Sequence, residues 1–264
     1  MRGITLVVAM ALAFVPSSAG TVSVVYAGSL VRVMEGPLAA SLRSHTGLAF
    51  SGEGKGSKAL AQLITSGLRT PDVFISADPS LLHGIAPCVV FGSARMVVAY
   101  SDRSPNRALL AQAAAGTRPI LSVLALPGMH VARTDPQLDP KGERTLTVVK
   151  LLGAHDHTPA LADAVVKNSE VFPEEDLAVR IESGEADAGF FYSTETPGRD
   201  LHVIELPADS NLSGSIAYAI ARLPDAPHPA AAARFVDFVL NGAGKRILEE
   251  AGVQFFAHPR RLPE

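Results

Sequence analysis

The sequence predicts an α/β fold in two lobes joined by a hinge, and three observations support this prediction. Short runs of β-branched and other apolar residues alternate with stretches of helical periodicity along the whole chain. A glycine-bearing turn follows each of the first two runs, in the order strand, turn, helix that parallel sheets use. After a second set of such units, residues 215–221 form one more apolar strand pattern before two closing helices.

The elements of the first lobe follow from its apolar runs and from the turns between them. Three runs are expected as strands, at 22–26, 48–51 and 73–76. The first leads through Gly28-Ser29 into an amphipathic stretch, and the second leads through Gly56-Ser57 into a helix. Ligands in such sheets bind at the carboxyl ends of the strands, where the helices begin.

The second set of elements starts at an apolar strand, 96–100, and ends near residue 209. The expected helices are 145–152, 159–166 and 174–183, and the expected strands are 188–192 and 202–205. The strand at 215–221 and helices at 229–240 and 243–251 complete the chain, with Gly252 ending the last helix.

Two crossings, near 97–101 and 209–217, would join the lobes. We therefore assign residues 20–97 with 214–264 to the first lobe and residues 98–213 to the second. Such crossings let one lobe close on the other around a ligand. A single-domain α/β enzyme fits the same periodicity, so the alternation by itself leaves both architectures open.

Residues 1–19 have the pattern of a secretory signal peptide. A positive charge at Arg2 precedes an apolar run, 4–15, and the small residues around Ala19 suit a cleavage site. A membrane anchor is the alternative, but the run is shorter than the roughly 20 residues that span a bilayer as a helix. No cysteine stands at the cleavage site for lipid attachment. We expect cleavage after Ala19 and a soluble protein that is periplasmic or secreted.

The composition disfavours several classes of function. The net charge is −3, with acids and bases interspersed, so no basic surface for nucleic acid or an anionic membrane is expected. The single cysteine, Cys88, excludes an internal disulfide and any site with several cysteine ligands. The pair His155 and His157 would point apart on a helix, which disfavours a metal site there. The sequence contains no nucleophile elbow, P-loop or dinucleotide motif.

Two Gly-Ser pairs at the ends of neighbouring strands are candidate anion-binding sites. At Gly28-Ser29 and Gly56-Ser57 the first backbone N–H groups of a helix lack helical partners and carry the positive end of its dipole. Such groups bind anions, and a serine hydroxyl adds one more donor. The alternative is that each serine only caps its helix.

The loop 130–142 and two later strand or helix ends contribute further candidates. Asp139-Pro140-Lys141 opens a helix after a strand and again presents N–H groups, although Asp-Pro is also ordinary turn chemistry. Glu174 begins a helix whose dipole favours acids in the first turn. Tyr192 ends a strand, where its ring either packs or places a hydroxyl in a cleft.

These motifs together resemble a known family, the periplasmic tungstate/molybdate-binding proteins that serve ABC importers, especially its archaeal branch. The resemblance covers nearly the whole chain after the signal peptide. It is carried by Tyr26-Ala27-Gly28-Ser29-Leu30, by Gly56-Ser57, by residues 71–78, by 96–100, by 182–187 leading to Tyr192, and above all by the loop 134–146 with its two Asp-Pro pairs. It implies a type II periplasmic binding protein fold with two lobes and a hinge.

The resemblance also implies the residues that contact the oxyanion. They are Gly28, Ser29, Ser57, Asp139, Pro140, Lys141, Glu174 and Tyr192. In the archaeal branch two carboxylates, here Asp139 and Glu174, are ligands of the Mo or W centre itself. Carboxylates facing a dianion would otherwise repel it, by about 4 kcal/mol per pair of unit charges at 4 Å and an effective dielectric constant near 20. Contact with an electron-poor metal centre removes this conflict, as does a protonated carboxyl group.

The chain departs from the family in three ways. It is shorter, so Glu175 or Asp176 could hold the role assigned to Glu174. Lys141 and Glu143 are charged where the family more often has small or aromatic residues. Lys141 is expected to contribute its backbone N–H, and its ammonium group could also reach the anion.

The resulting expectation is a binding protein, not an enzyme, that carries molybdate or tungstate and needs no other cofactor. Its expected partner is a membrane permease, and it is expected to be a monomer that does not bind nucleic acid. The alternatives are a type II binding protein for another solute, such as sulfate, phosphate or ferric iron, an extracytoplasmic sensor, and a secreted α/β hydrolase. The sequence leaves open which metal is preferred and whether it is four- or six-coordinate.

Overall fold

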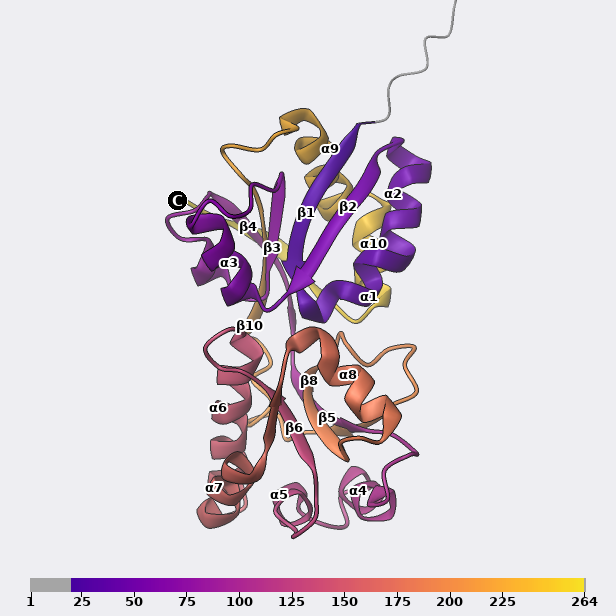
Figure 1. Ribbon diagram of the computed structural model, residues 1–264, viewed down its shortest axis with the longest axis vertical. Helices are drawn as coiled ribbons and strands as arrows, with labels where there is room; N and C mark the ends of the chain where they lie inside the picture. The colour runs from indigo at the N-terminus through magenta and orange to yellow at the C-terminus, as the bar shows by residue number, and fades with distance from the viewer. Residues whose placement is uncertain (1–19, 264) are drawn as a thin grey trace, which may run out of the picture.

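The computed structural model describes residues 20–263, which form two α/β lobes stacked along the long axis of the molecule (Figure 1). Each lobe is built on its own mixed β-sheet. The expected signal peptide, residues 1–19, lies outside the described residues. Within residues 20–263, no helix combines the length and the apolar character needed to cross a membrane.

The first lobe contains a six-stranded sheet in the order β11-β4-β10-β3-β1-β2. Strand β1 is parallel to β2 and β3, whereas β10 is antiparallel to β3 and β4, and β11 is antiparallel to β4. The strands are β1 (Thr21–Ala27), β2 (Ala49–Lys55), β3 (Val73–Ser76), β4 (Cys88–Ala94), β10 (Ile216–Arg222) and β11 (Gln254–Leu262). The helical segments are η1 (Gly28–Leu30), α1 (Val31–Val33), η2 (Met34–Leu38), α2 (Ala39–Thr46), α3 (Ser57–Thr65), η3 (Pro79–Leu82), α9 (Pro229–Leu240) and α10 (Ala243–Glu250).

Alternating side chains of the strands in this sheet build a core on each of its faces. In β1, Val22, Val24 and Tyr26 pack on one face with α2, α9 and α10, while Val25 packs on the other face with α3. This alternation follows from the two-residue period of a strand. The helices therefore cover both faces, and the carboxyl ends of β1, β2 and β3 are directed toward the second lobe (Figure 1).

The second lobe contains a five-stranded sheet in the order β7-β6-β8-β5-β9. Strand β6 is parallel to β7 and β8, whereas β5 is antiparallel to β8 and β9. The strands are β5 (Met96–Tyr100), β6 (Val131–Thr134), β7 (Glu170–Phe172), β8 (Ala188–Tyr192) and β9 (His202–Glu205). The helices are α4 (Arg107–Ala114), α5 (Ile120–Leu124), α6 (Pro140–His155), α7 (Pro159–Asn168) and α8 (Glu174–Ser183).

Helix α8 covers one face of this sheet and helix α6 packs on the other. Leu177 and Ile181 of α8 pack with Val97 and Ala99 of β5, whereas Val98 of β5 faces the opposite core. Both α6 and α8 start at the boundary between the lobes, where β6 and β7 end (Figure 1). The helix starts of both lobes thus meet at this boundary.

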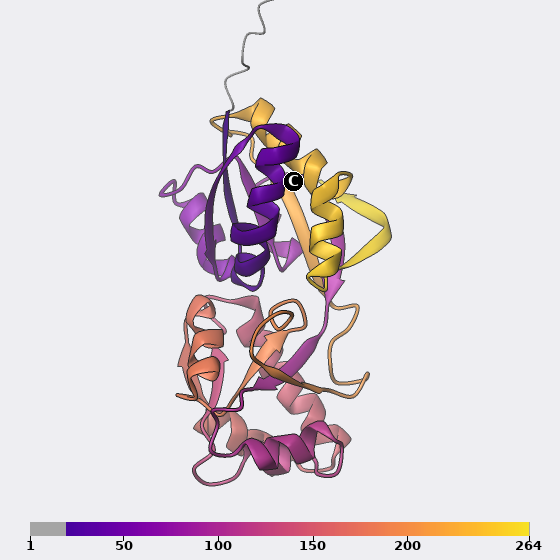
Figure 2. The same cartoon turned by 90° about the vertical axis from the view of Figure 1, so that its right-hand side faces the viewer.

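The chain passes between the sheets twice. Only Arg95 separates β4 from β5, and residues 206–215 lead from β9 to β10. The Met96 N–H donates to the carbonyl oxygen of Asn211 at 2.8 Å, which joins the two crossings. Figure 2 shows the crossings together on one side of the boundary. Met96 and Val97, assigned above to the first lobe, pair within the second sheet.

Several expected elements match the structure residue for residue, including β3, β5, α8 and α9. The expected parallel arrangement of the first three strands is confirmed, since β1 is parallel to β2 and β3. Each sheet as a whole is mixed, because strands that leave a lobe or return to it, such as β5 and β10, run antiparallel to their neighbours. Strands β4, β7 and β11 were not anticipated. Strand β7 has only three residues, and β11 is a mostly exposed edge strand that contains Pro259, a residue tolerated at sheet edges.

Candidate functional site

The candidate site lies at the boundary between the lobes, where η1 and α3 of the first lobe face α6 and α8 of the second. Gly28 and Glu174 define this contact. The Gly28 N–H donates to Glu174 Oε2 at 3.0 Å, and a Cβ atom added to Gly28 would lie 2.5 Å from that oxygen. A side chain at position 28 would therefore displace the carboxyl group, so glycine allows the close approach of the two lobes.

Ser29 and Ser57 are both buried, and neither side chain caps its helix. Ser29 Oγ lies 3.1 Å from the Tyr218 hydroxyl oxygen, which lies 2.9 Å from Thr194 Oγ1. Ser57 Oγ accepts the Ala77 N–H at 3.2 Å, which leaves its own hydroxyl hydrogen available to donate. The alternative of simple capping was therefore wrong for both residues.

Asp139 is the N-cap of α6, and Pro140 is the buried first residue of that helix. Asp139 Oδ1 accepts the Lys141 N–H at 2.9 Å. The second oxygen, Oδ2, is buried and has no hydrogen-bond partner among the described residues. The Lys141 backbone N–H, expected to face an anion, is thus used by the cap, and the Asp139 carboxyl retains one free oxygen.

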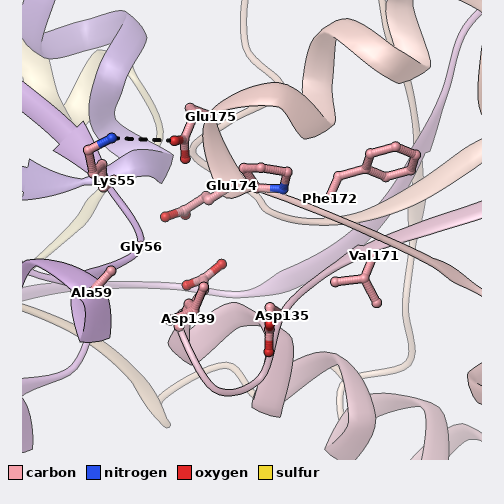
Figure 3. Close-up of a pocket in the computed structure, with 11 residues that line it drawn as sticks. Lys55, Gly56, Ala59, Asp135, Asp139, Val171, Phe172, Glu174 and Glu175 are labelled. Atoms are coloured by element: carbon pink, nitrogen blue, oxygen red, sulfur yellow. Dashed lines mark ion pairs between the residues drawn. The ribbon is translucent and has the colours of Figure 1, made fainter.

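Three consecutive acids open α8, and of these only Glu174 is buried. Its exposed fraction is 6%, and its Oε1 lacks a hydrogen-bond partner within the described part of the chain. Glu175 is exposed and lies 3.8 Å from Lys55 Nζ, and Asp176 is exposed as well. Figure 3 shows the carboxyl groups of Glu174 and Asp139 directed into the same space beside Gly56.

The side chain of Lys141 is completely buried and lies among acids. Its Nζ lies 2.6 Å from Glu195 Oε1 and 3.5 Å from Glu174 Oε1. Glu195 Oε2 accepts the Tyr192 N–H at 2.6 Å. Glu195 was missed in the sequence, although it follows the strand-end Tyr192 by three residues, in the same polar turn.

Tyr192 is buried at the end of β8, and its hydroxyl accepts a hydrogen bond from Arg144 Nη1 at 2.7 Å. The same guanidinium nitrogen donates to the carbonyl oxygen of Ala77 in the first lobe at 3.0 Å. Because the Tyr192 oxygen accepts from Arg144, its hydrogen can be donated elsewhere. Arg144 and Tyr218 are two further residues of the boundary that periodicity did not identify.

Burial dominates the electrostatics of these groups. It raises the pKa of Glu174 well above its ordinary value, and the Asp139 carboxylate raises it further, while Lys141 opposes both effects. Burial likewise raises the pKa of Asp139 and of Glu195, against the attraction of Lys141. Burial alone would lower the pKa of Lys141, but the three surrounding carboxylates outweigh it and raise that pKa. Burial also raises the pKa of Tyr192 well above 10, so its hydroxyl stays neutral.

A cleft of about 430 Å³ opens onto the two carboxyl groups (Figure 3). Its walls come from both lobes, with Lys55, Gly56 and Ala59 on one side and Leu138, Phe172 and Glu174 among the residues of the other. The Ala59 N–H donates to the Leu138 carbonyl oxygen at 3.1 Å, which holds the lobes together beside the cleft. The cleft therefore opens the boundary to solvent beside Asp139 and Glu174.

The structure brings all eight expected residues to this one boundary. It offers neutral hydroxyl donors, one buried ammonium group and two carboxyl oxygens that accept no hydrogen bond from residues 20–263. Hydroxyl and ammonium donors suit an anion, and free carboxylate oxygens suit a hard, electron-poor centre. The site therefore fits a small anion that contains a hard, electron-poor centre.

Comparisons with known proteins identify several relatives of this chain. The chain is 32% identical over 200 residues to an ABC transporter molybdenum-binding protein of Haloferax volcanii, with 74% of the chain and 62% of that relative covered. It is 25% identical to the molybdate/tungstate-binding protein WtpA of Thermococcus kodakarensis over 90% of the chain and 83% of the relative. The chain thus spans less than two thirds of the length of the Haloferax protein.

Among the solved structures whose fold resembles that of this chain is the periplasmic molybdate-binding protein of Azotobacter vinelandii. It superposes with a TM-score of 0.69 over 92% of this chain and all of that one, at 22% sequence identity. The expected type II periplasmic binding protein fold is thereby confirmed. The family model of the bacterial extracellular solute-binding proteins matches residues 22–254. The chain belongs to this family, whose members are binding proteins and not enzymes.

Proposed function

We propose that this protein is the extracytoplasmic receptor of an ABC importer and that it captures molybdate or tungstate between its lobes. The oxyanion would be bound by Gly28, Ser29, Ser57, Asp139, Pro140, Lys141, Glu174 and Tyr192. Asp139 and Glu174 would act as ligands of the Mo or W centre. The loaded protein would then deliver the oxyanion to a membrane permease.

The observation that carries this proposal is the pair of buried carboxyl oxygens, Asp139 Oδ2 and Glu174 Oε1, without hydrogen-bond partners in the described structure. Burying such atoms unpaired costs several kcal/mol, so they favour a solute that supplies an electron-poor centre. A Mo(VI) or W(VI) centre accepts additional oxygen ligands. The sulfur of sulfate and the phosphorus of phosphate do not, so those anions would be repelled by these two carboxylates without gaining a ligand bond from them.

The buried hydroxyl groups of the site support the proposal that the solute is an anion. Ser57 and Tyr192 each accept one hydrogen bond from the protein, so each can donate its hydrogen to an oxyanion. Ser29 is held by Tyr218, whose hydroxyl also reaches Thr194. These donors are neutral and buried, and hydrogen bonds to a charged acceptor are the stronger kind.

The relatives support the choice of solute, because the proteins of Haloferax and Thermococcus are named for molybdenum, or for molybdate and tungstate. We further propose that residues 20–97 with 214–264 and residues 98–213 move as two bodies about the crossings, except that Met96 and Val97 move with the second body, in whose sheet they pair. Export through cleavage after Ala19, action in the periplasm and a monomeric state complete the proposal.

Calorimetry on the chain from Gly20 onward tests the proposal, with molybdate, tungstate, sulfate, phosphate and ferric citrate as solutes. Molybdate or tungstate should bind tightly and raise the melting temperature, since a ligand at 1,000 times its Kd stabilises by about 4 kcal/mol. Sulfate and phosphate should bind at least about 100-fold more weakly. Equal binding of sulfate, or tight binding of ferric citrate alone, would refute the assignment.

A further inference from the structure

We propose that the buried ammonium group of Lys141 makes the site selective for doubly charged oxyanions, with Glu195 as the residue that positions it. This inference rests on the function proposed above and deepens it. The sequence left two contributions of Lys141 open, its backbone N–H and its ammonium group, and the backbone N–H donates to the Asp139 carboxyl. The ammonium group is therefore the part of Lys141 that remains for a solute.

The position of the ammonium group supports this role. Lys141 has no exposed surface, and its Nζ lies 2.6 Å from Glu195 Oε1 and 3.5 Å from Glu174 Oε1. The rings of Phe191 and Tyr192 lie beside it, with centroids at 5.6 and 5.8 Å. It is thus enclosed next to two proposed solute contacts, Glu174 and Tyr192.

The hydrogen-bonding capacity of the ammonium group exceeds what its protein neighbours take up. An ammonium group has three N–H donors, and within residues 20–263 the one hydrogen bond that Lys141 Nζ donates goes to Glu195. The Glu174 contact at 3.5 Å is an ion pair without a hydrogen bond. Donors therefore remain for an oxygen of a solute that lies against Glu174.

Glu195 is anchored on both of its oxygens. Oε2 accepts the Tyr192 N–H at 2.6 Å, and Oε1 accepts from Lys141 at 2.6 Å. This anchoring keeps the long lysine side chain extended toward the boundary. Glu195 thus positions the ammonium group and is not itself a solute contact.

The charge of the site explains why the Lys141 ammonium group affects selectivity between dianions and monoanions. Asp139, Glu174 and Glu195 place three acids around the ammonium group, so a solute that enters meets negative charge on several sides. A full positive charge in a water-excluded site attracts a dianion about twice as strongly as a monoanion. Neutral hydroxyl donors discriminate less between the two. Loss of the ammonium group should therefore weaken binding of a dianion far more than binding of a monoanion.

Tungstate and perrhenate allow a direct test, because both are tetrahedral oxyanions of similar size and they differ by one unit of charge. Calorimetry would measure both anions on the wild type, Lys141→Met, Glu195→Gln and the double variant. Lys141→Met should weaken tungstate binding at least about 100-fold and perrhenate binding by less than about tenfold. Glu195→Gln alone should keep tungstate binding within about tenfold of the wild type.

The double variant Lys141→Met with Glu195→Gln separates this role from a structural one. It removes both charges of the buried pair, and such paired replacements are commonly tolerated by the fold. The double variant should remain as deficient in tungstate binding as Lys141→Met. Recovery of tungstate affinity to within about threefold of the wild type would overturn the inference, because Lys141 would then only neutralise Glu195.

Melting curves without oxyanion verify that each variant is folded. If Lys141→Met alone fails to fold, the tungstate affinity of the double variant is compared with that of Glu195→Gln, since these two proteins differ only at Lys141. The double variant should bind tungstate far more weakly. A wild-type protein that binds no tungstate would refute the proposed function. A wild type that binds tungstate, with unchanged affinity in Lys141→Met, would refute only this inference.

Discussion

The Gly28 N–H donates to the carboxyl group of Glu174 at 3.0 Å, although the two residues lie 146 positions apart in the chain and on different lobes. The contact joins the first turn after β1 to the first residue of α8. It brings a helix-start donor and a buried acid into one site.

Glu174→Gln should weaken tungstate binding at least about tenfold, a loss of about 1.4 kcal/mol. The amide keeps the shape of the side chain, and its oxygen can still accept the Gly28 N–H, but it is a poorer ligand for a metal centre. Calorimetry measures the change. The matched control is Asp176→Asn, since Asp176 is exposed and lies two residues away in the same helix turn. Equal losses in both variants would argue against a specific role for Glu174.

Tyr192→Phe should weaken molybdate and tungstate binding by about 10- to 100-fold, because a hydrogen bond to a charged group contributes about 1.5–3 kcal/mol. The variant also leaves Arg144 without its hydroxyl acceptor. The control is Tyr100→Phe, which lies at the other end of the paired strands β5 and β8. Unchanged affinity of Tyr192→Phe would exclude the hydroxyl as a donor to the anion.

Gly56→Ala should hinder closure of the lobes. A Cβ atom there would lie 2.6 Å from the Leu138 carbonyl oxygen and 3.2 Å from Asp139 Cβ, both in the other lobe, so backbone must shift. The backbone of Gly56, with φ −52°, suits alanine, and the effect is therefore one of space. Tungstate affinity should fall, and small-angle scattering with tungstate should give a larger radius of gyration than in the wild type.

The control for this variant is Gly20→Ala, because the nearest atom to its added Cβ would be Leu48 Cδ2 at 3.8 Å, an ordinary contact. Its affinity and radius of gyration should equal those of the wild type. A Gly56→Ala protein that binds tungstate normally would mean that the lobes need not approach this closely at Leu138.

The pair of Arg95 and Glu205 should make stability depend on acid pH. The hydrogen bond from Arg95, whose Nε lies 2.9 Å from Glu205 Oε2, lowers the pKa of that carboxyl below its ordinary value. A lowered pKa in the folded state stabilises the protein above the unfolded value, about 4.3. This contribution is lost as the pH falls through the folded value. Since Glu205 is largely exposed, it amounts to less than about 1 kcal/mol.

Denaturant unfolding from pH 7 to pH 3 measures this contribution. Glu205→Gln should lower the free energy of unfolding at pH 7 and flatten its decline below about pH 4.3. Arg95→Met should have the same effect, and the double variant should add little to either. An unchanged pH slope in Glu205→Gln would show that the pair does not contribute to stability.

Local sequence patterns predicted much of the fold. Strands such as β3 and β5 and helices such as α8 and α9 were predicted with their observed bounds, because hydrophobic periodicity and turn residues are local properties. The start of a helix at Asp139-Pro140 was predicted in the same way. The edge strands β7 and β11 were missed, since short or exposed strands carry little periodic signal.

The sequence by itself determined the alternation of strands and helices, the helix starts that carry anion donors, and the resemblance that named the site residues. Only the tertiary structure decided which of the acids Glu174, Glu175 and Asp176 is buried, and only it placed Glu195 against Lys141. The physical reason is distance along the chain. Capping and periodicity act over a few residues, whereas burial and charge pairing depend on how two lobes pack.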